Sequence, residues 1–131
     1  MKQIRAIIID DEADARDIIR NNLREYCEGV DLVGEADGVS SGLQVIKQLN
    51  PDLIFLDIEM EDGTGFDLLN QLDSVKPQII FTTAYDEFAI KAFKYSTVDY
   101  LLKPIDIDEL IDATKKVSAS VSSSNAALEE K

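Results

Sequence analysis

Short apolar runs alternate with longer amphipathic stretches along the whole chain. One run, Leu53–Leu56, is wholly apolar, is preceded by Asn50-Pro51-Asp52 and stops at Asp57. Four apolar residues without a turn former predict a strand that is buried on both faces. The other predicted strands are Ile4–Ile9, Asp31–Ala36, Ile79–Phe81 and Asp99–Leu102, of which the second is less apolar and suits an edge position.

Each predicted strand is followed by apolar residues at helical spacing. The first helix is expected to end near Cys27, and Asp106 with Glu109 resembles a capping box at the start of the last helix. The residues expected to face the core are Ala15, Ile19, Leu23 and Tyr26 in the first helix, Val39, Leu43, Ile46 and Leu49 in the second, Leu68, Leu69 and Leu72 in the third, and Ile107, Leu110, Ile111, Thr114 and Val117 in the last. A short fourth helix carries Phe88, Ala89, Ala92 and Phe93.

Strands that alternate with helices predict one parallel sheet covered on both faces. We therefore predict a flavodoxin-like, doubly wound α/β fold with five strands in the order 2-1-3-4-5. A length of 131 residues fits a single domain, which we expect to span residues 1–120. Residues 121–131 are expected to form a Ser-rich linker or tail.

The charge of the chain excludes several classes of function. Its formal net charge is −13, so it repels phosphate backbones and is not expected to bind nucleic acid directly. No apolar run approaches the length of a membrane span, and no room for a signal peptide precedes the first strand. The single cysteine, Cys27, permits no internal disulfide and is interpreted as a small buried apolar residue. These features favour a cytoplasmic protein.

Chemically active side chains stand where the predicted strands end. Asp10 and Asp11 follow the first strand, Asp57 the third, Thr83 the fourth and Lys103 the fifth. The carboxyl ends of parallel strands meet at the edge where open α/β sheets bind ligands. Three clustered carboxylates require raised pKa values or a cation, and a few oxygen ligands beside open positions favour Mg²⁺. For each Asp alone a structural role stays open: a helix cap at Asp10, a solvated side chain at Asp11 and a turn residue at Asp57.

Together these groups predict a site for a phosphoryl group. The metal ion and Lys103 would neutralise its oxygens, Thr83 would donate a hydrogen bond, and the Asp57 carboxylate would accept the group covalently. The chain contains no histidine, so a phosphohistidine donor must lie on another protein.

The motifs Asp10-Asp11, Asp57, Thr83-Ala84 and Lys103-Pro104, in this order, resemble the receiver domain of bacterial two-component response regulators. The resemblance extends from about Ile4 to Val117. A finer resemblance, to the receivers of LytTR-type regulators, lies in the runs Thr83-Ala84-Tyr85-Asp86-Glu87-Phe88-Ala89, Lys91-Ala92-Phe93 and Asp99-Tyr100-Leu101-Leu102-Lys103-Pro104. Such regulators carry a separate DNA-binding domain after the receiver, which implies a role in transcription regulation.

The resemblance implies a role for each matching residue. Asp57 resembles the phosphoacceptor, Asp11 and Asp57 the side-chain ligands of Mg²⁺ (or Mn²⁺), Asp10 a ligand that acts mostly through water, and Glu59 a ligand through its backbone carbonyl. Lys103 resembles the family's lysine, which precedes a cis bond to Pro104. Thr83 and Tyr100 resemble the switch pair, although Tyr100 is equally compatible with an ordinary strand aromatic.

Phosphorylation by a sensor histidine kinase is expected to rearrange the fourth helix, fifth strand and fifth helix. Phe88, Lys91, Lys94 and Tyr95 on that face would form an output surface, with a homodimer contact as the expected partner; plain solvent exposure, with Phe88 and Phe93 in the core, is the alternative. Such a domain is a signalling domain, not an enzyme, and promotes its own phosphorylation and dephosphorylation.

Two departures from the family pattern concern the loop after Asp57. Met60 is followed by Glu61 where the family usually has proline, and this is expected to free the loop and to add a charge near the site. Glu59, with Tyr85 opposite, is hypothesised to screen the acyl phosphate from water. Two other functions remain as alternatives: a Mg²⁺-dependent phosphohydrolase that works through an aspartyl phosphate, and a receiver-like interaction module that is never phosphorylated.

Overall fold

A parallel sheet of five strands forms the centre of the computed structural model, which describes residues 3–73 and 77–117. In spatial order the strands are β2 (Val30–Ala36), β1 (Ile4–Ile9), β3 (Leu53–Leu56), β6 (Gln78–Thr83) and β7 (Thr97–Leu102). This is the predicted order 2-1-3-4-5, because β6 and β7 are the fourth and fifth strands of this sheet. The flavodoxin-like prediction is thereby confirmed. The predicted linker at residues 121–131 lies outside the described residues.

The central strand β3 has the composition that its position requires. All four of its side chains are fully buried, since helices cover both faces of the sheet. Its register aligns the carboxyl ends of its neighbours: Leu56 pairs with Ile9 of β1 and with Phe81 of β6. The residues that follow β1 and β3 therefore begin at the same level of the sheet, whereas β6 continues two residues further, to Thr83.

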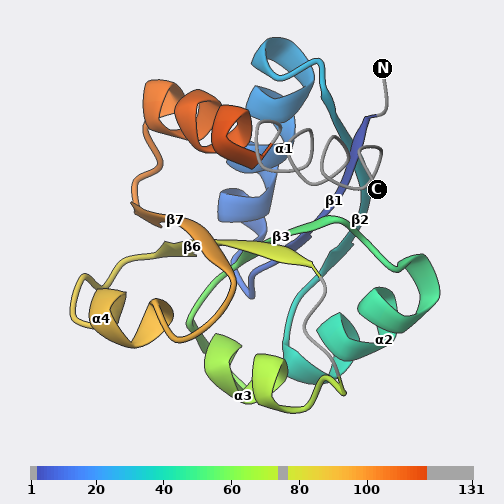
Figure 1. Cartoon of the computed structure of the whole chain (residues 1–131), viewed down its shortest axis with the longest axis vertical. Coiled ribbons are helices and arrows are strands. Elements are labelled where there is room, and N and C mark those ends of the chain that lie inside the picture. The colour runs from blue at the N-terminus through green and yellow to red at the C-terminus, as the bar shows by residue number, and fades with distance from the viewer. Residues whose placement is uncertain (1–2, 74–76, 118–131) are drawn as a thin grey trace, which may run out of the picture.

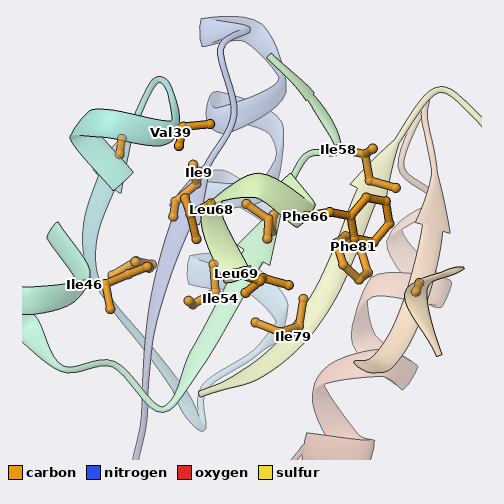
Figure 2. Close-up of a cluster of buried hydrophobic side chains, with 14 residues drawn as sticks. Ile9, Val39, Ile46, Ile54, Ile58, Phe66, Leu68, Leu69, Ile79 and Phe81 are labelled. Atoms are coloured by element: carbon orange, nitrogen blue, oxygen red, sulfur yellow. The ribbon is translucent and has the colours of Figure 1, made fainter. Parts of the chain in front are cut away.

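The helices form two layers (Figure 1). α1 (Ala13–Tyr26) and a helix of residues 107–117 cover one face, while α2 (Val39–Leu49), α3 (Gly65–Asn70) and α4 (Ala89–Ala92) cover the other. Figure 2 shows the core beneath the second layer, where α3 packs onto β3 and β6. Its buried side chains include Ile54, Phe66, Leu68, Leu69, Ile79 and Phe81. On the opposite face Ile19, Leu23, Phe55, Leu110 and Val117 form the second core.

Tyr26 and Ile107, which helical spacing assigned to the core, and Phe93, which only the alternative reading placed there, are exposed, and each stands at the end of a helix. Tyr26 is 48% exposed because Cys27, which is buried, takes the next inward position after Leu23. Phe93 is 79% exposed, since α4 is a single turn that ends at Ala92. Ile107 is 40% exposed at the first residue of the last helix.

The loop after Asp57 contains a short hairpin. Two short strands, β4 (Glu59–Met60) and β5 (Gly63–Thr64), pair in antiparallel register. Neither strand was predicted, because two residues are too few to show a period. The expected effect of the missing proline on the freedom of this loop stays a prediction, and the structure adds that the loop forms a hairpin.

None of the helices in the described ranges, 3–73 and 77–117, combines the length and apolarity needed to cross a bilayer.

Candidate functional site

The side chains singled out in the sequence gather at the carboxyl edge of the sheet. Asp10 and Asp11 follow β1, Asp57 follows β3 and Lys103 follows β7. Backbone hydrogen bonds continue past the strand ends, from Asp57 N to the Ile9 carbonyl oxygen (2.9 Å) and from Lys103 N to the Thr83 carbonyl oxygen (2.8 Å). The sheet itself thus fixes the distances between these residues.

The Lys103 ammonium is the centre of the cluster. Its Nζ lies 2.9 Å from Asp10 Oδ2, 3.2 Å from Asp57 Oδ2 and 2.6 Å from Glu12 Oε1. Asp10 is fully buried and the Lys103 side chain is only 14% exposed, so water screens these charges weakly. One cation therefore balances part of the charge of three carboxylates.

This packing changes the proton affinities of both partners. Burial, and next the charge of Asp10, raise the pKa of Asp57 to about 6, although Lys103 opposes the shift. Burial alone would lower the pKa of Lys103, but hydrogen bonds to Glu12 and Asp10 outweigh it and the pKa is raised. Lys103 is consequently charged at neutral pH, and Asp57 is predominantly an anion.

Two residues that the sequence analysis did not assign to the site hold the loop after β1. The backbone N–H of Glu12 donates to Asp10 Oδ1 (2.9 Å), and Arg16 Nη1 donates to the Asp10 carbonyl oxygen (2.5 Å). Glu12 could have been noticed because it directly follows two aspartates, whereas helical spacing placed Arg16 away from the core. Both contacts fix the backbone from which Asp10 and Asp11 project.

The carboxylates provide a donor set that suits a hard divalent cation. One oxygen each from Asp10, Asp11, Glu12 and Asp57 lies within 4.8 Å of the others. Asp10 Oδ2 is buried and lies 2.9 Å from the Lys103 ammonium. Oxygen donors of this kind, in excess of the positive charge beside them, fit Mg²⁺.

A cavity of about 450 Å³ opens above the carboxylates. Asp11, Asp57 and Lys103 line one part of it, and Glu59 and Tyr85 line another. Gly65, the first residue of α3, packs closely against the Asp57 backbone. A Cβ at this position would lie 2.6 Å from the Asp57 carbonyl oxygen, so no larger residue fits without a shift of the backbone. The cavity provides room for a small anionic group beside the Asp57 carboxylate.

Thr83 and Tyr100 lie next to the site, but their hydroxyl groups make hydrogen bonds to Tyr85 rather than to the Lys103 ammonium at its centre. Thr83 is fully buried, and its hydroxyl accepts a hydrogen bond from Tyr85 N (3.4 Å). The Tyr100 hydroxyl donates to the Tyr85 carbonyl oxygen, and its ring lies 6.0 Å from that of Phe81. Burial raises the pKa of Tyr100. Both residues therefore contact the segment that links β6 to α4.

The remaining sequence-predicted residues lie at the rim. The Lys103–Pro104 peptide bond is cis. Glu59 is exposed in β4, on the loop that follows Asp57.

Known proteins with similar sequences include bacterial sensory transduction proteins. The chain is 40% identical to the sensory transduction protein LytT of Bacillus cereus over 115 residues, which cover 86% of this chain and 46% of that protein. It is 37% identical to the sensory transduction protein LytR of Staphylococcus haemolyticus over 124 residues, which cover 93% of this chain and 48% of that protein. The chain spans about half the length of the curated relatives it matches.

Solved structures with the same fold are also receivers. The REC domain of AraT, a response regulator from Geobacillus stearothermophilus, superposes with a TM-score of 0.83 at 29% identity and covers 93% of this chain and 98% of that chain. The response regulatory domain of mrkE from Klebsiella pneumoniae gives 0.81 at 28% identity, with 89% and 97% covered.

The family model of the response regulator receiver domain matches residues 6–115. Domains of this family are signalling domains rather than classical enzymes, and they interact with histidine kinases. The match spans all the strand ends described above, and the relatives of the LytT and LytR type agree with the finer resemblance. The chain belongs to the response regulator receiver domain family.

Proposed function

We propose that Asp57 is the phosphoacceptor of this receiver domain and that a sensor histidine kinase is the phosphoryl donor. One observation carries the proposal: the buried Asp57 carboxylate faces the Lys103 ammonium at 3.2 Å, at the base of an open cavity. Such a carboxylate is a positioned nucleophile whose developing product charge has a cation beside it.

The transfer exchanges one bond for another. An oxygen of the Asp57 carboxylate forms a bond to phosphorus while the bond from phosphorus to the kinase histidine nitrogen breaks. The imidazole leaves with the bonding electrons and later gains a proton from solvent. Lys103 stabilises the negative charge on the phosphoryl oxygens, and no residue of this chain needs to remove a proton.

Asp10, Asp11, Asp57 and the backbone carbonyl of Glu59 would hold Mg²⁺ or Mn²⁺, with Asp10 acting mostly through water. The ion would neutralise phosphoryl charge. Arg16 and the backbone of Glu12 keep Asp10 in place through the contacts described above.

The phosphorylated state would be sensed by Thr83 and Tyr100. Within residues 3–73 and 77–117 the Thr83 hydroxyl holds one hydrogen bond, at 3.4 Å, and can exchange it for a phosphoryl oxygen. The Tyr100 ring would then turn into the space vacated. Since Tyr100 bonds to the Tyr85 carbonyl oxygen, the change reaches the segment before α4.

The output face would comprise α4, β7 and the helix of residues 107–117, and it would form a homodimer on phosphorylation. Of the four residues expected there, Phe88 and Tyr95 pack against Phe66, with ring centroids 6.2 and 5.3 Å away, while Lys91 and Lys94 are exposed. The most exposed apolar side chains of this face are Ile90 (82% exposed) and Phe93 (79%), and these would form the contact.

The domain would span residues 1–120 of a longer regulator. The Ser-rich stretch at residues 121–131 would link it to an output domain, which we propose to be a LytTR-type DNA-binding domain in transcription regulation. The relatives support this because the chain matches about half of each. We expect the regulator to act in the cytoplasm, without direct contact of this segment with nucleic acid or membrane.

The proposal is tested by labelling with acetyl phosphate and Mg²⁺. Intact-mass spectrometry should show one added phosphoryl group on the parent and none on Asp57→Asn. Labelling of both proteins, or of neither, would refute the assignment. The same sample should not turn over a generic phosphate ester, as a phosphohydrolase would.

The lifetime of the phosphorylated state is proposed to depend on Glu59. Glu59 and Tyr85 line the same cavity as Asp57, so they can exclude or screen an attacking water molecule. Glu59→Asn should accelerate dephosphorylation, measured as loss of the labelled species after removal of acetyl phosphate. An unchanged or slower loss would contradict this role.

A further inference from the structure

The turn of the β4–β5 hairpin binds the start of α2. We infer that Asp62 is a positioning residue for the metal site. Its carboxylate holds the hairpin against α2, and the hairpin forms one wall of the site. This inference rests on the proposed function, in which Glu59 provides a ligand. The family resemblance assigns no role to Asp62.

Both oxygens of the Asp62 carboxylate are used. Oδ1 accepts a hydrogen bond from Val39 N (2.8 Å) and Oδ2 accepts one from Ser40 N (3.1 Å). The first N–H groups of a helix have no partner within it, and the N-cap of α2, Gly38, has no side chain to supply one. The Asp62 carboxylate, which lies 23 residues after Val39 and 22 residues after Ser40, therefore caps this helix.

The glycine at position 38 makes room for this contact. A Cβ on Gly38 would lie 2.8 Å from Asp62 Oδ1, closer than the two atoms can approach. The same docking leaves little room at Gly63, where a Cβ would lie 3.2 Å from Val39 Cγ2. The two hydrogen bonds also lower the pKa of Asp62, so the carboxylate stays ionised at neutral pH.

The same hairpin reaches the candidate metal site with its other residues. Met60 pairs with Gly63, so Glu61 and Asp62 form the turn. Glu59, Met60 and Glu61 line the cavity beside Asp57. Asp62 thus stands directly after the last of three cavity-lining residues, and a displacement of its carboxylate shifts them.

The hairpin is attached at its other end as well. Thr64 and Asp67 form a capping box at the start of α3, in which Asp67 N donates to Thr64 Oγ1 (3.1 Å) and Thr64 N donates to Asp67 Oδ2 (2.9 Å). The loop is therefore held between two helices, and this arrangement takes the place of the proline that the family usually has.

The experiment compares Mg²⁺ affinity across four variants of the full chain by isothermal titration calorimetry. Asp62→Ala should raise the Kd for Mg²⁺ about tenfold, as loss of outer-shell support does at other metal sites. Asp62→Asn keeps one acceptor oxygen and should restore most of the affinity. Gly38→Ala, which displaces the carboxylate from the other side, should weaken binding like Asp62→Ala.

Asp37→Ala is the matched control. It removes the same charge beside the same helix end, but Asp37 bonds to Ser41 rather than to the hairpin. A second readout, amide hydrogen exchange, should show faster exchange at Val39, Ser40 and Met60 in Asp62→Ala and in Gly38→Ala, but not in Asp37→Ala.

The outcomes separate the inference from the proposed function. If the parent binds Mg²⁺ and Asp62→Ala weakens binding no more than Asp37→Ala does, the positioning role is refuted and the proposed function stands. If the parent does not bind Mg²⁺, the proposed function fails, and with it the role of Asp62 that rests on it.

Discussion

Lys103 Nζ lies 3.2 Å from Asp57 Oδ2, although the two residues are 46 positions apart and follow different strands. The distance is fixed by the sheet, in which β6 lies between β3 and β7. Both groups are largely buried, so each depends on the other for its charge balance. This dependence leads to the first two predictions.

Replacement of Lys103 should destabilise the domain. Lys103→Met leaves Asp10 and Asp57 buried without their partner cation, and the free energy of unfolding should fall by about 3 kcal/mol in metal-free buffer, measured by urea denaturation. The control is Lys116→Met, which removes a cation from the more exposed ion pair with Asp99 and should cost less than about 1 kcal/mol. Equal losses in the two variants would show that burial of the Lys103 ion pairs does not increase their contribution to the free energy of unfolding.

Replacement of Asp57 should have the opposite effect, with a defined pH dependence. The pKa of Asp57 is raised from 3.8 to about 6, so the folded state holds the proton more tightly than the unfolded state does. Ionisation of Asp57 therefore destabilises the fold above about pH 6 and has no effect below the unfolded pKa.

Asp57→Asn should accordingly raise the free energy of unfolding by about 1–2 kcal/mol near pH 7.5, after allowance for solvent screening. The gain should disappear as the pH falls from about 6 to 3.8. Urea denaturation with a chelator present measures both. A gain that is independent of pH would contradict the ionisation argument.

Mg²⁺ should stabilise the folded domain through Asp11. Among the described residues Asp11 makes no side-chain hydrogen bond or ion pair, so Asp11→Asn can remove a ligand without breaking a structural contact. At about 100 times its Kd, Mg²⁺ should add about 2.7 kcal/mol and raise the Tm of the parent by roughly 5–10 °C, measured by differential scanning calorimetry. The shift should be lost in Asp11→Asn and kept in Asp14→Asn, an exposed acidic residue in the first turn of α1.

The exposed apolar residues of α4 should control self-association. Phe93→Ser should leave the free energy of unfolding within about 0.5 kcal/mol, because the side chain is 79% exposed. It should nevertheless abolish the dimer that the parent forms with beryllofluoride and Mg²⁺, observed by sedimentation velocity. Tyr26→Ser alters an exposed aromatic on α1 and should dimerise normally. A parent that sediments identically with and without beryllofluoride would argue against this output surface.

The sequence was sufficient to predict the sheet and the place where its active side chains meet. Runs such as Leu53–Leu56 have one compatible environment, and the strand order then determines which residues follow neighbouring strands. Helix ends were less predictable: spacing assigned Tyr26 and Ile107 to the core, but spacing does not show where a helix begins or stops.

The contacts of single polar side chains could not be read from spacing at all. Glu12 has the composition of an exposed helix start, yet it bonds to Lys103, 91 residues away. The Tyr100 hydroxyl reaches a backbone carbonyl that no motif specifies. Strands of two residues, as in β4 and β5, are too short to leave a period in the sequence.

The capping of α2 by Asp62 has a consequence for protein engineering. Residues 58–65 do not determine their own conformation, since it depends on the glycine at position 38 and on Asp67. Grafting this loop alone into another receiver should therefore fail to transfer its geometry, and a chimera would need all three segments to inherit it.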